Sequence, residues 1–143
     1  MPAGSPPKLI YLVTEDWYFR SHRMPMARAA RDAGFEVVVA TRINSEEDRR
    51  AIEAEGFRVV ALDWDRGSKH PLRELFAMIA IAKLYLREKP SVVHHVALKP
   101  VLEGGIAAWI ADVPAIVNAL TGLGAVFIGS GLATRLLRPA IRL

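Results

Sequence analysis

Short apolar runs alternate with longer segments of mixed polarity along this chain of 143 residues. The runs are rich in valine, isoleucine and other residues that favour strands. The first run is almost continuously apolar, which is typical of a strand that is buried on both faces. The pattern predicts five strands, at residues 8–13, 36–40, 58–62, 92–96 and 115–119.

The segments between these runs carry helix signals. Gly34 and Gly56 follow two of them, and glycine is the usual left-handed residue just beyond a helix. Ser45 precedes three acidic residues, which suits a helix start. The predicted helices cover residues 21–33 or 24–33, 45–55, 71–89, a segment that opens at 99–100, and 132–143. The helix at 71–89 is apolar on most sides, so we expect it to be nearly buried.

Strands that alternate with helices at this spacing predict an α/β fold. We expect a Rossmann-like parallel sheet with helices on both faces and the strand order 3-2-1-4-5. In such sheets ligands bind at the carboxyl ends of the strands, where the strand order reverses. The polar segment 14–20, predicted to be a loop, and the turn at 95–99 should therefore face each other across one crevice.

Two adjacent histidines, His94 and His95, lie near the end of the fourth predicted strand. Neighbouring residues of a strand point to opposite faces, so only one can readily face the crevice, and the other is packed or on the surface. Imidazole suits a general base or polar anchor at neutral pH. We predict a catalytic role for His95, or for His94, because the strand register leaves both open. Their side chains diverge, so no metal site is predicted.

The substrate-binding residues are expected on both sides of the crevice. Asp16 would orient a hydroxyl, while Trp17 or Tyr18 would stack on a sugar or another flat apolar face. Packing under the first helix is the alternative for at least one of the two rings. Lys99 lies at a predicted helix start, where positive charge and free N–H groups can hold a phosphate.

Three more candidate substrate-binding residues lie at the end of the fifth predicted strand or just after it. Asn118 either reaches the crevice or bonds to the backbone. Thr121 and Gly122 open a glycine-rich turn and complete the predicted substrate-binding residues.

Composition narrows the possible functions. The chain has one domain's length, 52% hydrophobic residues, no cysteine and a net charge of +4. The absence of cysteine excludes disulfides and cysteine-based metal sites or nucleophiles. The mild positive charge fits ordinary solubility or a basic face toward anionic lipid or phosphorylated ligands. The chain lacks the runs of Lys and Arg interleaved with aromatics that are typical of nucleic-acid binding, so we do not expect a nucleic-acid partner. We also expect neither a secretory signal nor a transmembrane segment.

The turn after the first strand contains no glycine, and the chain has no phosphate-binding P-loop motif. A glycine-free turn cannot bring its backbone against a pyrophosphate as dinucleotide-binding folds do. We therefore expect no bound cofactor.

Three stretches together resemble a known family. They read DWYFRSHRMPMARAARDAGFEVVVAT, HHVALKP and PAIVNALTGLG. They look like the N-terminal, acceptor-side domain of family-four glycosyltransferases of the two-domain GT-B type. Bacterial members of that family act in surface-polysaccharide biosynthesis. The resemblance covers the chain from about residue 8 to its end.

The resemblance implies transfer of a sugar from a nucleotide-sugar to a glycan or polyprenyl-linked acceptor, with retention of configuration and without a metal. The resemblance implies a Rossmann-like domain at 8–143 that is incomplete at its C-terminus. The sequence itself predicts a flexible leader at 1–7. The nucleotide-sugar would bind a C-terminal domain or partner chain, so the 143 residues alone are expected to be inactive. A cytoplasmic location, with peripheral contact at the inner face of the membrane, is also implied.

Two alternatives remain open from the sequence. One is half of a non-hydrolysing nucleotide-sugar epimerase, which shares the two-domain architecture. The other is a non-enzymatic binding subunit or remnant.

Overall fold

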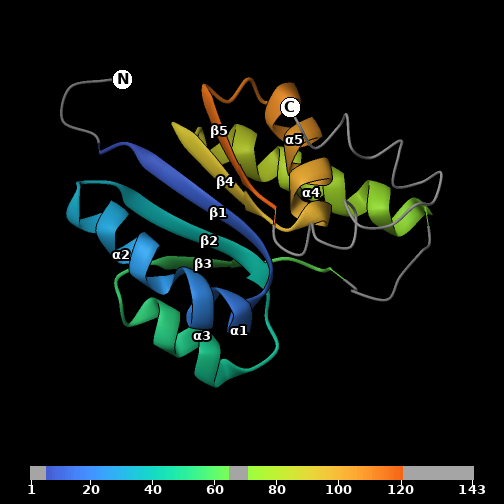
Figure 1. Ribbon diagram of the computed structural model, residues 1–143. Helices are drawn as coiled ribbons and strands as arrows, with labels where there is room; N and C mark the ends of the chain where they lie inside the picture. Colours follow the sequence, from blue (N-terminus) through green and yellow to red (C-terminus); the bar gives the residue numbers. More distant parts are fainter. Residues whose placement is uncertain (1–5, 65–70, 121–143) are drawn as a thin grey trace, which may run out of the picture.

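The computed structural model describes residues 6–64 and 71–120 (Figure 1). Strands and helices alternate along the described chain. The elements are β1 (Lys8–Glu15), α1 (Asp16–Tyr18), the π-helical turn η1 (Phe19–Arg23), α2 (Met24–Asp32), β2 (Glu36–Arg42), α3 (Glu46–Glu53), β3 (Arg58–Ala61), α4 (Pro71–Glu88), β4 (Val92–Val96), α5 (Leu98–Ile110) and β5 (Ala115–Ala119).

The strands form one parallel sheet in the order β3-β2-β1-β4-β5. This order confirms the predicted Rossmann-like arrangement. Leu12 of β1 lies beside Ala40 of β2 and His95 of β4. The order reverses between β1 and β4, so the turns after these two strands lie at the same edge of the sheet.

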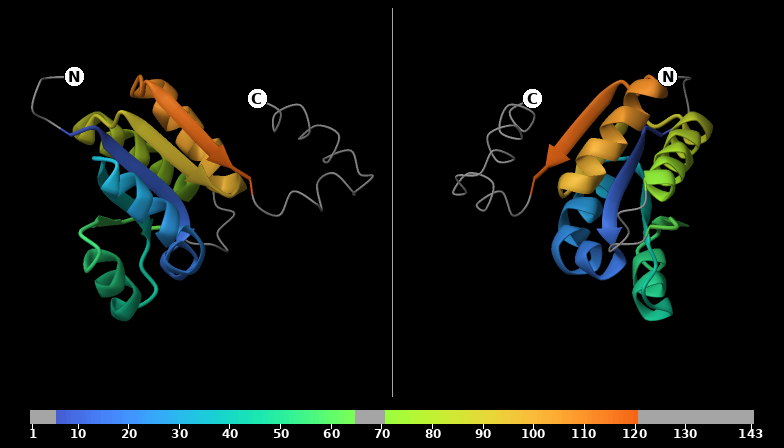
Figure 2. Two further views of the ribbon diagram at one scale, coloured as in Figure 1. Left: turned by 60° about the vertical axis from the view of Figure 1, so that its left-hand side comes forward. Right: turned by 90° about the vertical axis from the view of Figure 1, so that its right-hand side faces the viewer.

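Helices cover both faces of the sheet (Figure 2). Alternate strand residues supply two cores, as the period of a strand requires. Tyr11, Val39 and Val96 pack with α2 and α3 on one face. Ile10, Val38 and Val93 pack with α4 and α5 on the other face.

The structure confirms two kinds of helix signal, the glycines that follow a helix and the serine that caps a helix start. Gly34 and Gly56 have φ angles of 103° and 88°, in the left-handed region that favours glycine. The Ser45 hydroxyl accepts a hydrogen bond from the backbone N–H of Asp48 at 3.1 Å and caps α3.

The prediction of a loop at residues 14–20 is wrong. β1 continues to Glu15, and a helical segment begins directly at Asp16. Phe19 is fully buried, with its ring centroid 5.2 Å from that of Tyr11 and 6.3 Å from that of Phe57. The helical segment thus carries a large ring into the core, which a solvent-exposed loop would not do.

The expectation that α4 is nearly buried is also wrong. Its buried residues are Ile81, Ala82, Leu84 and Tyr85, all on the side that faces the sheet and α5. The exposed large hydrophobic side chains on α4 are Leu72, Leu75, Phe76, Ile79 and Leu86. The predicted helix at 132–143 and the site residues Thr121 and Gly122 lie outside the described residues.

Candidate functional site

A cavity of about 360 Å³ lies between the turn after β1 and the turn after β4. This is the place where the reversal of strand order predicts a crevice. The residues that line it are Val13, Thr14, Glu15, Trp17, Tyr18, Val96, Ala97 and Lys99. Of the predicted site residues, the cavity therefore brings together Trp17, Tyr18 and Lys99.

Trp17 and Tyr18 form an aromatic wall on the α1 side of this cavity. Trp17 is 44% exposed, and its ring meets that of Tyr18 edge to face at 6.0 Å. The other face of Tyr18 stacks on His22 at 4.4 Å. An exposed indole beside a phenol held by stacking offers both an apolar face and a polar hydroxyl to a ligand.

Ala97 is a strained residue in the wall of the cavity. It links β4 to α5 with φ 79° and ψ 167°, a backbone conformation that is almost confined to glycine. Its N–H donates to the carbonyl of Ala119 at 2.9 Å, which ties the strained turn to the end of β5.

We expect Ala97→Gly to raise the free energy of unfolding by about 1 kcal/mol, because glycine adopts this conformation without steric conflict. Thermal or denaturant unfolding of the two proteins measures this difference. An equal or lower stability of the variant would show that the turn is not strained by the Ala97 side chain.

Asp16 does not line the cavity, because its side chain is fully buried at the start of α1. Its carboxylate accepts hydrogen bonds from the backbone N–H of Trp17 at 2.8 Å and from the backbone N–H of Asn44 at 2.8 Å. It also accepts from the side-chain amide of Asn44 at 2.9 Å, and that amide donates to Glu15 as well. Asp16 thus ties the turn after β1 to the turn after β2.

His95 is also fully buried, between β4 and the helices α4 and α5. Its Nδ1 lies 3.0 Å from Oδ1 of Asn118, and its Nε2 lies 2.9 Å from the Tyr85 hydroxyl. Since an amide oxygen only accepts, Nδ1 carries the proton and the Tyr85 hydroxyl donates to Nε2. Burial lowers the pKa of His95 to about 4, so the ring is neutral near pH 7.

His95 should make stability depend on pH. Its pKa is lower in the folded chain than in the unfolded one, so the unfolded state binds the proton first as the pH falls. This contribution to the free energy of unfolding should fall by about 2 kcal/mol between pH 7.5 and pH 5. Burial raises the pKa of Glu103. The folded chain therefore binds the Glu103 proton more readily than the unfolded chain does, and this contribution to the free energy of unfolding rises as the pH falls.

The difference between the unfolding profiles of wild type and His95→Gln isolates the histidine contribution, because Glu103 is present in both. We expect the advantage of the wild type to shrink toward pH 5. A difference that does not change with pH would contradict a neutral, buried His95.

His94 points to the opposite face of the sheet, as adjacent strand residues must. It is 6% exposed and its ring stacks on Tyr11, with the centroids 4.8 Å apart. Its Nε2 and the Nε of Arg23 are buried and have no hydrogen-bond partner in the described part of the chain. A buried polar atom without a partner costs on the order of 1–3 kcal/mol. The structure therefore separates the two candidate histidines, and neither lines the cavity.

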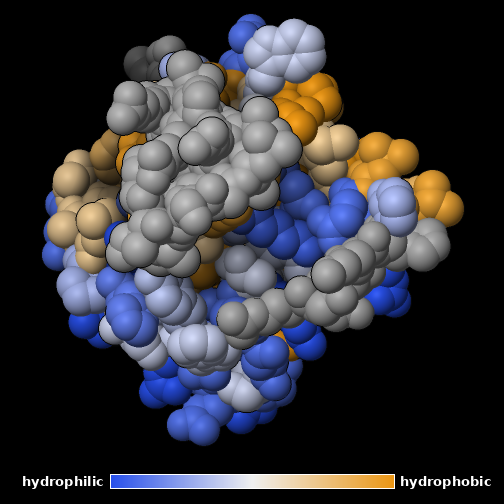
Figure 3. All heavy atoms as spheres, turned by 45° about the vertical axis from the view of Figure 1, so that its right-hand side comes forward, coloured by the Kyte–Doolittle hydropathy of each residue, from blue (hydrophilic) through white to orange (hydrophobic). Residues whose placement is uncertain are grey.

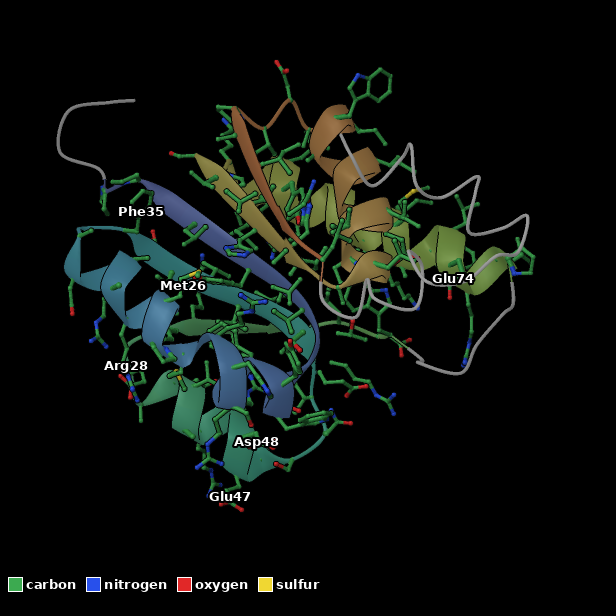
Figure 4. The ribbon with its side chains drawn as sticks, viewed as in Figure 1. Met26, Arg28, Phe35, Glu47, Asp48 and Glu74 are labelled. Atoms are coloured by element: carbon green, nitrogen blue, oxygen red, sulfur yellow. The ribbon has the colours of Figure 1, made fainter. Side chains whose placement is uncertain are left out.

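Lys99 lies in the first turn of α5, and its ammonium reaches toward α4. It pairs with the Glu74 carboxylate at 3.2 Å and lies 5.5 Å from the centre of the Trp64 ring. Trp64 is buried and its indole N–H donates to Glu103 at 2.9 Å. Figure 4 shows Glu74 on α4, on the opposite side of the sheet from Arg28 and Asp48.

Sequence reasoning missed Glu74, Glu103 and Trp64. Burial and the hydrogen-bonded Glu74 carboxylate raise the pKa of Glu103, whereas the hydrogen bond with Glu103 lowers the pKa of Glu74. No spacing signal could have found this cluster, because its members come from three separate segments. A second cavity of about 380 Å³ lies beside Trp64 and α4, away from the reversal between β1 and β4.

The chain matches the model of the family described as glycosyl transferase 4-like over residues 8–143. The chain belongs to this family. The resemblance carried by the three sequence stretches is thus confirmed for a glycosyl transferase 4-like domain with the sheet order of a GT-B N-terminal domain. No curated protein matches the sequence.

Solved structures share the fold at low sequence identity. A glycosyltransferase from Rickettsia africae ESF-5 has a TM-score of 0.64 at 12% identity, over 80% of this chain and 29% of that one. MurG of Acinetobacter baumannii has a TM-score of 0.60 at 15% identity, over 79% of this chain and 35% of MurG. A Listeria monocytogenes protein described as a putative UDP-N-acetylglucosamine 2-epimerase has a TM-score of 0.64 at 16% identity. The match covers 93% of this chain and 37% of that protein. The glycosyl transferase 4-like chain thus spans 29–37% of the length of these proteins.

Residues 6–64 and 71–120 hold neither a metal-ligating cluster nor a helix that could cross a membrane. No three side chains of the kinds that ligate metals come together there. None of the helices in these ranges combines the length and the apolar character needed to span a bilayer.

Proposed function

We propose that this domain is the acceptor-binding half of a retaining glycosyltransferase. It would receive a glycan or polyprenyl-linked acceptor, to which a sugar is transferred from a nucleotide-sugar during polysaccharide biosynthesis. The observation that carries the proposal is the cavity with an aromatic wall at the reversal between β1 and β4, in a chain of the glycosyl transferase 4-like family.

The roles of the cavity residues follow from their chemistry. Trp17 and Tyr18 stack on the acceptor and contact its hydroxyl groups. Lys99 supplies positive charge for an anionic part of the acceptor or donor. In this proposal His95, Asn118 and Asp16 touch no substrate, because their side chains hold β4, β5 and the two turns in place.

The nucleotide-sugar would bind a further domain or a partner chain, with residues 8–143 as the acceptor domain and 1–7 as a leader. Holding two reactants together supplies much of the rate of a transfer reaction. We therefore expect the 143 residues alone to bind acceptor without transferring sugar.

The test compares Trp17→Ala with Trp109→Ala in binding to a short-chain polyprenyl diphosphate-linked sugar. Trp109 is 82% exposed on α5 and does not line the cavity, so it is a matched control. We expect Trp17→Ala to weaken binding at least about tenfold, as loss of a stacking aromatic should. Equal affinity of both variants and the wild type would overturn the proposed acceptor site.

A nucleotide-sugar epimerase is the second candidate, favoured by the fold shared with proteins described as UDP-N-acetylglucosamine 2-epimerases. The chain, together with any polypeptide that completes it, can be incubated with nucleotide-sugars with and without acceptor. Acceptor-dependent transfer supports the transferase, whereas epimerisation without acceptor supports the second candidate. Binding without either reaction would leave a non-enzymatic binding subunit.

We further propose a cytoplasmic protein that contacts the inner face of the membrane through α4. Its exposed Leu75, Phe76 and Ile79 are accompanied by exposed Lys83 and Arg87. Hydrophobic side chains gather on part of the surface that Figure 3 shows. Apolar and basic side chains on one helix suit an anionic lipid surface, and co-sedimentation with anionic vesicles that Phe76→Asp abolishes would support this contact.

A further inference from the structure

Glu15 brings a carboxylate to the wall of the acceptor cavity. It ends β1, and only 7% of its surface is exposed. The lining of the cavity includes two charged side chains, Glu15 on β1 and Lys99 on α5. Lys99 pairs with the Glu74 carboxylate of α4 at 3.2 Å. Glu15 therefore adds an acidic group to the β1 side of the cavity.

The end of β1 is irregular where it reaches the cavity. Val13 lies beside Thr41 of β2, whereas Glu15 lies beside Arg42, so the register shifts between Val13 and Glu15. Such a bulge re-aims the side chains around it and often occurs next to binding sites. Val13, Thr14 and Glu15 all line the cavity, although a regular strand would turn every second side chain away. The bulge thus accounts for a carboxylate in the cavity wall.

Asn44, in the turn after β2, holds this carboxylate in place. Its side-chain amide donates to Oε2 of Glu15 and, at 2.9 Å, to Oδ1 of Asp16. The backbone N–H of Asn44 donates to Oδ2 of Asp16 at 2.8 Å, so the asparagine is itself fixed at two points. A binding group that is held by a second layer of hydrogen bonds loses little freedom when a ligand arrives. Asp16 therefore supports Glu15 through Asn44.

The chemistry of a carboxylate selects the ligand group that it can bind. A carboxylate only accepts hydrogen bonds and offers about four acceptor positions, of which the Asn44 amide uses one. Its charge repels phosphate and other anions, so hydroxyl groups are the partners that suit it. Trp17 lines the same cavity with an exposed indole on which a sugar ring can stack. A stacking face together with a fixed hydrogen-bond acceptor fits a ring that carries hydroxyl groups.

We infer that Glu15 is a substrate-binding residue whose carboxylate accepts a hydrogen bond from a hydroxyl group of the acceptor sugar. This contact also orients the acceptor. Its hydroxyl group lies on the β1 side of the cavity, and its anionic part lies on the α5 side, where Lys99 supplies positive charge. The role that the sequence predicts for Asp16 thus belongs to the preceding residue. The inference rests on the proposed function, because it takes the ligand of the cavity to be a sugar acceptor.

The experiment measures the binding of a short-chain polyprenyl diphosphate-linked sugar to the 143-residue chain and to Glu15→Gln. The measurement is repeated with deoxy probes, in which each sugar hydroxyl in turn is replaced by hydrogen. We expect Glu15→Gln to weaken binding of the parent probe about fivefold or more, because a charged acceptor becomes a neutral one. One deoxy probe should bind equally to the variant and the wild type, since it lacks the hydroxyl that Glu15 contacts.

Glu53→Gln is the control, because it removes the same charge outside the cavity. Glu53 pairs with Arg49 on α3 at 3.0 Å and does not line the cavity, so its replacement should leave binding unchanged. Equal affinity of Glu15→Gln and the wild type for the parent probe would overturn the inference. An equal loss with the parent and every deoxy probe would also overturn it, because Glu15 would then only support the turn after β1.

Trp17→Ala separates this outcome from that of the proposed function. Weaker binding of the parent probe by Trp17→Ala, with no loss in Glu15→Gln, would refute only the hydroxyl contact of Glu15. Equal affinity of the wild type, Trp17→Ala and Glu15→Gln would refute the proposed acceptor site and the Glu15 contact with it. Binding of a deoxy probe by Glu15→Gln shows in addition that the cavity of the variant is folded.

Discussion

Replacement of His95 by alanine is expected to lower the free energy of unfolding by about 3 to 5 kcal/mol. The ring is fully buried between β4, α4 and α5, so its removal leaves a cavity. It also deprives the Tyr85 hydroxyl and the Asn118 amide oxygen of their hydrogen-bond partner. Denaturant unfolding of the wild type and the variant measures the loss.

His22→Ala is the matched control for this prediction. His22 is exposed, so its replacement should change stability by no more than about 0.5 kcal/mol. A loss below about 1 kcal/mol for His95→Ala would indicate that His95 is not part of the folded core, and a catalytic role in the cavity would regain support.

Gly104→Ala is expected to lower the free energy of unfolding by about 3 kcal/mol. A Cβ atom at Gly104 would lie 2.5 Å from Nε2 of His95 and 2.7 Å from Cδ2 of Leu12, both inside the core. The clash would push α5 away from the sheet or displace the His95 ring from Tyr85.

The adjacent Gly105 provides the control on the same helix. A Cβ atom there would meet nothing within 4 Å, and alanine is the better helix former by about 1 kcal/mol. We therefore expect Gly105→Ala to raise stability while Gly104→Ala lowers it. A change of the same sign for both variants would contradict the close packing of α5 on His95.

The sheet could be predicted from the sequence because its signals are local and its connections follow general rules. The bounds of β4 and β5 agree with the prediction, since β-branched runs limited by proline and polar residues define them. The strand order followed from the right-handed connections of parallel strands. The position of the cavity followed from that order alone.

The partners of the polar side chains could not be predicted. Asp16 bonds to Asn44, and Lys99 pairs with Glu74, residues far apart in sequence that only the folded chain brings together. A polar residue at the end of a strand has the same sequence signature whether it faces a ligand or supports a turn. Asp16 and His95 support the fold, whereas Trp17 remains exposed beside the cavity.

The face of the sheet to which each histidine side chain points depends on the strand register, and a shift of one residue would exchange the two faces. His94 lies beside Tyr11 and His95 lies beside Leu12, and these two β1 residues belong to opposite cores. The sequence predicts that the two histidines diverge. It does not indicate which core each one joins, because both neighbours are apolar.

The three tryptophans of the chain allow the most direct test of the proposed acceptor site. Trp17 lines the proposed site, Trp64 lines the second cavity beside α4, and Trp109 is exposed on α5. The measurement is the set of indole N–H resonances during titration with a short-chain polyprenyl diphosphate-linked sugar. We predict that the Trp17 resonance shifts and saturates while those of Trp64 and Trp109 stay in place. An unchanged Trp17 resonance, with movement of Trp64 or Trp109, would contradict an acceptor site between β1 and β4.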